Sequence, residues 1–254
     1  MLARSARDLA GLTRVGETIA ACLEELRAAV APGRTTAELD ARAAAFLSVR
    51  GAQSGPILTY EYPGFTCISV NDEVVHGVPG SRVLRAGDLV TLDIAAELKG
   101  FHADAATTVG VGDVAPAAER LMAATRAALA AGIRAAVPGA TLRDVGAAIS
   151  RVSEARGYRV FRELTGHGIG REMHEDPTVY NFALDEAEAD LVLEPGMVFT
   201  IEPMLTAGAD ALVQGADGWT MRAADGALTA HEEHTIVVRE GAALVLTAAP
   251  AAAA

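Results

Sequence analysis

The chain has 254 residues, of which 51% are hydrophobic and 21% are charged. This length and composition suffice for one substantial core, so we expect a single domain over residues 1–254. The formal net charge of −12 excludes a general electrostatic attraction to nucleic acid or to an anionic membrane. We therefore expect neither a nucleic-acid partner nor a membrane partner.

Cysteine content and hydropathy indicate the compartment. Cys22 and Cys67 are the two cysteines, too few for a disulfide framework. Charged residues interrupt the amino terminus, and no apolar run reaches the ~20 residues that span a bilayer. The sequence therefore predicts a cytoplasmic location, with the alanine-rich end, 248–254, as a flexible tail.

Two pairs of helices are expected, each followed by a β-rich stretch. Helical periodicity covers about 6–30 and 36–50, and then about 115–136 and 142–156. This order predicts two pseudo-equivalent halves. The halves would span about 1–112 and 113–247.

Short sequences recur at matching places in these halves. Pro32-Gly33 and Arg50-Gly51 return 106 residues later as Pro138-Gly139 and Arg156-Gly157. Thr35 with Glu38 forms a capping-box pattern at the start of a helix, and Thr141 with Asp144 forms a weaker variant of it. The sequence therefore predicts an internal structural repeat.

Each half contains an apolar strand that ends in an acidic residue. The stretch ending at Asp93 resembles the one ending at Glu202, 109 residues later. An unpaired charge in a buried strand is costly, so cation coordination explains this placement better than a purely structural role. Asp104 and Glu233 precede β-branched segments in a similar way. Two halves that face each other would bring these four carboxylates together.

Asp93 and Asp104 are expected to face each other across a hairpin. With Leu98 and Lys99 at the tip and Gly100 beside them, the two aspartates become direct cross-strand partners. Such partners have Cβ atoms ~4.5–5.5 Å apart, which is compatible with two metal ions ~3.5–4 Å apart. Without metal, the apposed carboxylates would repel each other and one would stay protonated.

Glu232 and Glu233 cannot both face this site, because neighbouring strand residues point to opposite faces. We expect Glu233 at the site and Glu232 toward solvent. Their flanking histidines, His231 and His234, do not form the zinc-protease motif, which needs histidines at i and i+4 on a helix. The sequence therefore does not predict a protease of that class.

Three histidines are candidates for the site. Glycines on both sides of His167 leave space for a metal and a substrate to approach its ring. His174 follows seven residues later, and His76 precedes a Gly-Val-Pro sequence. The residues alone leave all three open, whereas His102 is expected to be structural. The glycine-rich run around His167 lacks the strand-then-helix context of a dinucleotide fingerprint.

Several motifs, in order, carry a family resemblance. They are Cys67-Ile68-Ser69-Val70-Asn71, His76-Gly77-Val78-Pro79, Gly100-Phe101-His102-Ala103-Asp104, Gly166-His167-Gly168-Ile169-Gly170-Arg171, His174-Glu175-Asp176-Pro177, Phe199-Thr200-Ile201-Glu202-Pro203-Met204, Asp217-Gly218-Trp219-Thr220 and Glu233-His234-Thr235. Through them nearly the whole chain resembles the type I methionine aminopeptidases of the bacterial kind. The resemblance implies an α+β pita-bread fold with pseudo-twofold symmetry. In this fold a curved, mainly antiparallel sheet carries two outer helix pairs.

The resemblance also implies a two-metal centre. Asp93 would chelate one ion, Asp104 and Glu233 would bridge both, and His167 and Glu202 would complete the other. Carboxylate and imidazole ligands suit Co, Mn, Fe or Zn and do not select among them. Two divalent ions are therefore expected as cofactors.

Catalytic and substrate-binding roles follow from the same resemblance. Glu202 would shuttle a proton, His174 would stabilise the oxyanion and His76 would contact the scissile amide. The residues implied to contact substrate are Tyr62, Cys67, His76, Met173, His174 and Trp219. Met173 stands where the family commonly has Phe, and Val75 where it often has Cys. The region 56–60 lacks an aromatic residue at the usual place.

The implied reaction removes the initiator methionine from nascent polypeptides that have a small second residue. A monomer with transient ribosome proximity is expected. A proline-directed peptidase of the same fold, similar to aminopeptidase P or prolidase, is the nearest alternative. The helical start within ten residues of the beginning and Asp217-Gly218-Trp219 favour the methionine enzyme. A metal-free binding protein on the same scaffold is a second alternative, and the intact ligand set argues against it.

Overall fold

Helices form two pairs, as expected. The computed structural model describes residues 1–249, and the expected tail, 248–254, lies mostly outside that range. The helices are α1 (Ala6–Ala29), α2 (Thr36–Ser48), α3 (Gly55–Tyr60), α4 (Pro116–Ala135), α5 (Leu142–Ala155) and the 3-10 helix η1 (Ala187–Asp190). The four long helices confirm the predicted pairs. The short α3 was not predicted.

The strands pair antiparallel in four hydrogen-bonded sheets. One sheet holds β1 (Gln53–Ser54), β2 (Cys67–Val70), β4 (Leu89–Leu98) and β5 (Phe101–Gly110). Another holds β7 (Thr165–Gly168), β8 (Glu175–Tyr180), β9 (Val198–Ile201), β14 (His234–Val237) and β15 (Leu244–Val245). A third sheet holds β6 (Arg159–Val160), β10 (Met204–Thr206) and β13 (Thr229–His231). The fourth holds β3 (Glu73–Val75), β11 (Leu212–Gln214) and β12 (Met221–Ala223).

The internal repeat is visible in the capping of the second helix of each pair. Thr35 and Glu38 form a complete capping box on α2, and Thr141 and Asp144 form one on α5. Each capping threonine also makes an isolated antiparallel bridge, Thr35 to Val83 and Thr141 to Val192. The starts of α2 and α5 therefore repeat their main-chain contacts as well as their sequence.

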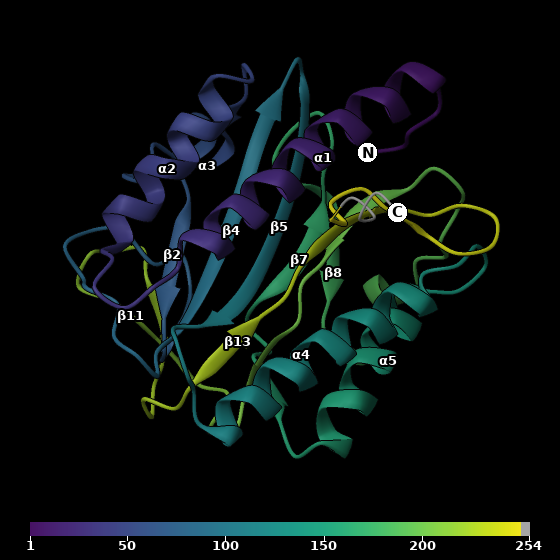
Figure 1. Cartoon of the computed structure of the whole chain (residues 1–254). Coiled ribbons are helices and arrows are strands. Elements are labelled where there is room, and N and C mark those ends of the chain that lie inside the picture. The colour runs from purple at the N-terminus through teal and green to yellow at the C-terminus, as the bar shows by residue number, and fades with distance from the viewer. Residues whose placement is uncertain (250–254) are drawn as a thin grey trace, which may run out of the picture.

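Each helix pair packs on its own part of the β layer. In Figure 1, α1 crosses in front of β4 and β5, while α4 and α5 lie together in the other half of the molecule. Leu12 and Ile19 of α1 share one core cluster with Leu92 of β4. Leu129 of α4 shares a second cluster with Phe199 of β9. The helices thus cover one side of the strands, and the residues implied to be functional lie on the other.

The β4–β5 hairpin has a different register from the one expected. Lys99 and Gly100, both with positive φ, form its tip, so Leu98 pairs with Phe101. Asp93 is consequently opposite Ala106, and Asp104 is opposite Ala95. The aspartates are therefore diagonal neighbours on one face of the hairpin, and the prediction of direct partners was wrong by one position of the turn. Diagonal neighbours, with Cα atoms ~7–8 Å apart, remain within reach of a shared ion.

No helix within residues 1–249 is long and apolar enough to cross a membrane.

Candidate metal centre and its cavity

A cavity of about 430 Å³ opens among the strands, and its lining includes the short helix α3 but no residue of the four long helices. Every residue to which the sequence analysis gave a functional role lines it: Tyr62, Cys67, His76, Asp93, Asp104, His167, Met173, His174, Glu202, Trp219 and Glu233. These residues come from both halves of the chain and from separate sheets. The fold therefore brings together groups that lie as far as 171 residues apart in the sequence.

Two overlapping groups of side chains could each hold a cation. Asp104, His167 and Glu233 offer ligand atoms within 4.8 Å of one another. Glu202, His231 and Glu233 form the second such group, so Glu233 is common to both. The His167 Nε2 atom lies 3.6 Å from Glu202 Oε1, which joins the two groups on the opposite side. Oxygen and imidazole-nitrogen donors of this kind suit divalent transition metals.

Burial makes the carboxylates of this cluster hard to ionise. It raises the pKa of Asp93 to about 7 and that of Glu202 to about 8. Burial, followed by repulsion from the neighbouring carboxylates, raises the pKa of Asp104 and Glu233 well above the ordinary values. Four negative charges in a buried site are unfavourable unless cations neutralise them.

Unpartnered atoms within the cluster test whether a metal fits. Asp104 Oδ1 and Glu233 Oε1 are buried and, among the described residues, have no hydrogen-bond partner. Buried polar atoms are nearly always hydrogen-bonded, so atoms left without a partner indicate a missing ion or water. His167 instead pairs its Nδ1 with the carbonyl of Gly168 at 3.0 Å, which leaves Nε2 free to bind a metal. The cluster therefore fits divalent cations.

Two threonines that the sequence analysis missed hold the ligand strands in place. Thr200 donates from Oγ1 to Glu202 Oε1 at 2.7 Å and accepts the main-chain N–H of His167 at 3.0 Å. Thr235, its cross-strand partner, accepts the N–H of Asp104 at 2.9 Å and donates to the Asp104 carbonyl at 2.7 Å. Thr200 lies two residues before Glu202, so the two side chains share one strand face. This spacing was the signal in the sequence that could have identified Thr200.

The glycines beside His167 lie against main-chain atoms of neighbouring segments. A Cβ at Gly166 would lie 2.6 Å from the carbonyl oxygen of Thr200, and one at Gly168 would collide with the carbonyl of Asp176. These close neighbours are main-chain atoms of adjoining segments. The glycines therefore permit close strand packing.

The backbone of His76 is left-handed, with φ of 57°. Non-glycine residues adopt this conformation at a cost, and it is found often at functional sites. Tyr62 donates its hydroxyl to the Gly77 carbonyl at 2.7 Å, and the Thr220 hydroxyl donates to the His76 carbonyl at 3.4 Å. These bonds hold the turn that places the His76 ring on the cavity wall.

Tyr60 is a third residue that the sequence analysis did not identify. Its hydroxyl forms a short hydrogen bond with Nδ1 of His174 and its ring lines the cavity. The His174 ring lies edge-on to that of His167, with centroids 4.1 Å apart. The region 56–60, described as lacking an aromatic residue at the usual place, thus supplies one from its last position. Tyr60 fixes the orientation of His174 because it occupies one of the two ring nitrogens.

An apolar wall lies next to the cluster. Trp219 packs edge-on to Tyr62 with ring centroids 5.2 Å apart, and Cys67 and Met173 are buried nearby in the same cavity. Cys67 pairs directly with Asp93 in the β2–β4 register, so this wall borders the metal ligands. A side chain of moderate length with a weakly polar sulfur would suit it.

Glu232 does not face solvent as expected. Its side chain is buried on the opposite face, where Thr107 donates a hydrogen bond at 3.1 Å and Arg126 lies 3.4 Å away. Burial raises the pKa of Glu232 to about 7, although Arg126 opposes the shift. This carboxylate lines a second cavity, of about 580 Å³, between α1 and α4.

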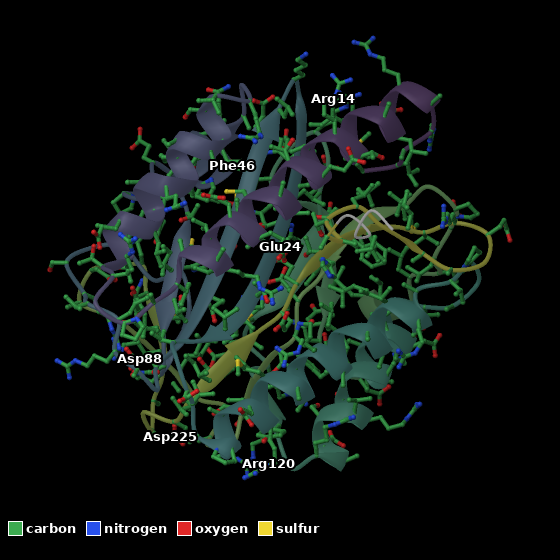
Figure 2. All side chains as sticks on the ribbon, viewed as in Figure 1. Arg14, Glu24, Phe46, Asp88, Arg120 and Asp225 are labelled. Atoms are coloured by element: carbon green, nitrogen blue, oxygen red, sulfur yellow. The ribbon has the colours of Figure 1, made fainter. Side chains whose placement is uncertain are left out.

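That second cavity lies on the helix-covered side of the strands. Glu24, labelled in Figure 2, lines it together with Arg27 and Arg126. Groups of side chains able to hold a metal, as found among the described residues, all belong to the first cavity. His102 is buried, donates its main-chain N–H to the Gly170 carbonyl and lies outside the lining of both cavities.

The sequence matches a known family of metallopeptidases. A sequence model of metallopeptidase family M24 matches residues 10–240. The chain belongs to this family. Methionine aminopeptidase 2 of Bacillus subtilis is 36% identical over 97% of this chain and 99% of its own length. This M24 chain is therefore a metallopeptidase relative along its whole described length.

Solved structures confirm the expected pita-bread fold. Methionine aminopeptidase from Thermotoga maritima superposes with a TM-score of 0.93 at 34% identity, covering 98% of this chain and all of that one. Xaa-Pro dipeptidase from Bacillus anthracis superposes with a TM-score of 0.78 at 24% identity, covering 98% of this chain and 62% of that one. The second likeness shows only that the fold is shared.

Proposed function

We propose that this M24 protein removes the amino-terminal methionine from nascent proteins and peptides, with preference for a small second residue. One observation carries the proposal: the buried acidic cluster lies directly beside an apolar wall formed by Tyr62, Cys67, Met173 and Trp219. Cations at the acidic cluster would bind the amino-terminal end of the substrate. The apolar wall would bind the methionine side chain. The similarity to proteins named methionine aminopeptidases supports the same conclusion.

The residues proposed to hold two divalent cations are Asp93, Asp104, His167, Glu202 and Glu233. Bound there, Co, Mn, Fe or Zn would polarise the scissile carbonyl and lower the pKa of a bound water. The unpartnered carboxylate oxygens and the raised carboxylate pKa values support this assignment.

Three side chains of the cavity are proposed to carry out proton transfer and orientation. Glu202, held by Thr200, accepts a proton from the attacking water and passes it toward the leaving amine. His174, with Nδ1 bonded to Tyr60, directs its other nitrogen at the developing oxyanion. His76, fixed by the left-handed turn, contacts the scissile amide. The pocket lined by Tyr62, Cys67, His76, Met173, His174 and Trp219 holds the methionine side chain.

The site of action is proposed to be the cytoplasm, where nascent chains with exposed initiator methionine emerge. The protein would act there as a monomer, with transient proximity to the ribosome. The proline-directed alternative shares the cluster, and its solved relative supports only the common fold. The alternative of a metal-free binding protein would leave the buried carboxylates without counter-charge.

A peptide panel tests this function. The full chain, reconstituted with Co²⁺ or Mn²⁺, should release methionine from Met-Ala-Ser and leave Leu-Ala-Ser, Ala-Pro-Ser and N-acetyl-Met-Ala-Ser intact. Faster cleavage of Ala-Pro-Ser would transfer the assignment to the proline-directed enzymes. Metal binding without cleavage of any peptide would reject catalysis altogether.

A further inference from the structure

His231 is a buried histidine of the cavity to which the sequence analysis gave no role. It ends β13, is 2% exposed and lines the same cavity as the metal cluster. Neither of its ring nitrogens has a hydrogen-bond partner among the described residues. A neutral imidazole has one donor and one acceptor, and both are rarely left unsatisfied inside a protein. The ring therefore lacks a partner that the site must supply.

Three other histidines in this part of the fold have a protein partner for Nδ1. His167 pairs it with the Gly168 carbonyl, His174 with the Tyr60 hydroxyl, and His234 with the Thr247 hydroxyl at 2.9 Å. His231 differs from all of these because it has a polar ring in a buried position with no such bond. Its partner must therefore come from within the cavity.

The distances place this ring within reach of a cation at the cluster. His231 Nε2 lies 3.7 Å from Glu233 Oε2. Protein nitrogen and oxygen ligands lie ~2.0–2.2 Å from a zinc ion, so two ligands of one ion are at most roughly 4.4 Å apart. The Nε2–Oε2 distance satisfies this limit. The ligand atoms of Glu202, His231 and Glu233 all lie within 4.8 Å of one another, so small side-chain adjustments would close the group on one ion.

The main chain around His231 is held firmly in this position. Its N–H is donated to Thr108 Oγ1 at 2.8 Å, and the Thr108 hydroxyl donates to the His231 carbonyl at 2.8 Å. His231 also pairs directly with Met204, two residues beyond Glu202. The backbone therefore fixes the imidazole next to both carboxylates before any ion binds.

We propose that His231 is a sixth protein ligand of the centre and binds, through Nε2, the cation shared by Glu202 and Glu233. This inference rests on the proposed function only in assuming that a divalent cation occupies the cluster. Because His167 Nε2 lies 3.6 Å from Glu202 Oε1, the cation bound by Glu202 would then have two imidazole ligands, from His167 and His231. Additional nitrogen ligation favours Zn, Co or Fe over Mn or Mg, which prefer oxygen ligands.

The test counts imidazole ligands directly and does not use peptide cleavage. The full chain is loaded with one equivalent of Zn²⁺ and studied by X-ray absorption, while competition with a chromophoric chelator gives the dissociation constant. His231→Gln keeps polar hydrogen-bonding groups and removes the imidazole. His234→Gln is the matched control, because it changes a histidine three residues away that bonds Thr247.

Two imidazoles per zinc are expected in the wild type and in His234→Gln, and one in His231→Gln. The His231→Gln dissociation constant should rise at least ~10-fold, comparable to the smaller effects of altering groups around a metal. Fewer than two imidazoles in the wild type, or unchanged zinc affinity in His231→Gln, would overturn the proposal. If His231→Gln fails to fold, the wild-type count still decides the question. Failure of the peptide panel with two imidazoles present would reject the proposed function alone.

Discussion

Glu232 and Glu233 are adjacent in the chain, and their carboxylates lie on opposite sides of the strand layer. Glu233 joins the cluster formed with Asp104 and His167. Glu232 accepts a hydrogen bond from Thr107 and pairs with Arg126 in the cavity beneath α1 and α4. Both side chains are buried, but only Glu233 lies at the acidic cluster. Substitutions on the two sides of the strand layer can therefore separate effects on catalysis from effects on stability.

Exchange of a carboxylate for an amide should lower catalytic activity on the side of the strands that holds the acidic cluster and not on the opposite side. Glu202→Gln removes both the negative charge and the proton-transfer capacity, so kcat/KM for Met-Ala-Ser should fall by about 10²–10⁴-fold. Glu232→Gln should leave kcat/KM close to that of the wild type, because its side chain does not line the catalytic cavity. Steady-state kinetics with a saturating metal concentration provide the measurement. Severe loss in Glu232→Gln with normal turnover in Glu202→Gln would contradict the assigned faces.

The stability of Glu232→Gln should depend on pH relative to the wild type. Burial raises the pKa of Glu232 from 4.5 to about 7 in the folded chain. Between these values the folded state keeps a proton that the unfolded state has lost, so the wild-type free energy of unfolding falls as pH rises. This penalty reaches at most about 3 kcal/mol above pH 7 and is absent below pH 4.5.

Urea denaturation of the metal-free proteins provides the measurement. Glu232→Gln should match the wild type near pH 4 and exceed it in stability at pH 8, with the difference growing between those values. Glu24→Gln is the control, since Glu24 lines the same cavity with its side chain half-exposed. A constant difference across the pH range would show that Glu232 does not titrate as described.

Metal removal should weaken the folded state as well as abolish activity. Cations that bind only the folded protein add about 2.7 kcal/mol of stability when present at 100 times their dissociation constant. Chelation leaves the carboxylates of Asp104 and Glu233 without counter-charge. We expect a lower Tm by calorimetry after chelation and recovery of both Tm and activity with Mn²⁺ or Co²⁺. Full activity in protein verified to be free of metal would reject the cation mechanism.

Thr200→Val tests the hydrogen bonds that position the ligands. The substitution keeps the shape of the side chain and removes the bonds to Glu202 and to the main chain of His167. Metal affinity should fall by about 10–100-fold, and the free energy of unfolding by about 1–3 kcal/mol. Thr125→Val is the control: Thr125 is equally buried on α4, where its hydroxyl bonds the Leu121 carbonyl. Isothermal titration should show weakened metal binding in Thr200→Val alone.

The elements fixed by local chemistry could be predicted from the sequence. The capping residues Thr35 and Thr141 set the start of α2 and α5, and the same motifs revealed the internal repeat. Acidic residues in apolar stretches drew attention to Asp93 and Glu202, because charge in a buried strand needs a specific partner. The expectation that both end their strands was wrong for Asp93, which lies within β4, whereas Glu202 directly follows β9. These features depend on neighbours in the sequence or on the cost of burial, and both are readable in one chain.

Features decided by tertiary packing could not be predicted in the same way. The β4–β5 turn is formed by Lys99 and Gly100, and a shift of one position changed the partner of Asp93. Glu232 was expected in solvent because strand alternation gives the face but not what covers it. His231 was not singled out as a site residue, since its unpartnered ring becomes apparent only when Glu202 and Glu233 are placed around it.

The second residue of the substrate should control the rate through the fit of the scissile amide. His76 and His174 line the cavity together with the acidic cluster, so the amide must lie among groups that are already fixed by Tyr60 and Tyr62. A small second residue such as Gly, Ala or Ser allows this position, whereas Leu or Lys would displace the carbonyl. A displacement of even ~1 Å can reduce the rate on the order of 10²-fold. The penalty should appear in kcat/KM, because transition-state stabilisation is lost.

Met-Xaa-Gly peptides that differ only in Xaa, assayed with one metal, provide the measurement. Met-Gly-Gly serves as the control for cleavage, and equal kcat/KM for Ala and Leu would show that the cavity does not select a small second residue.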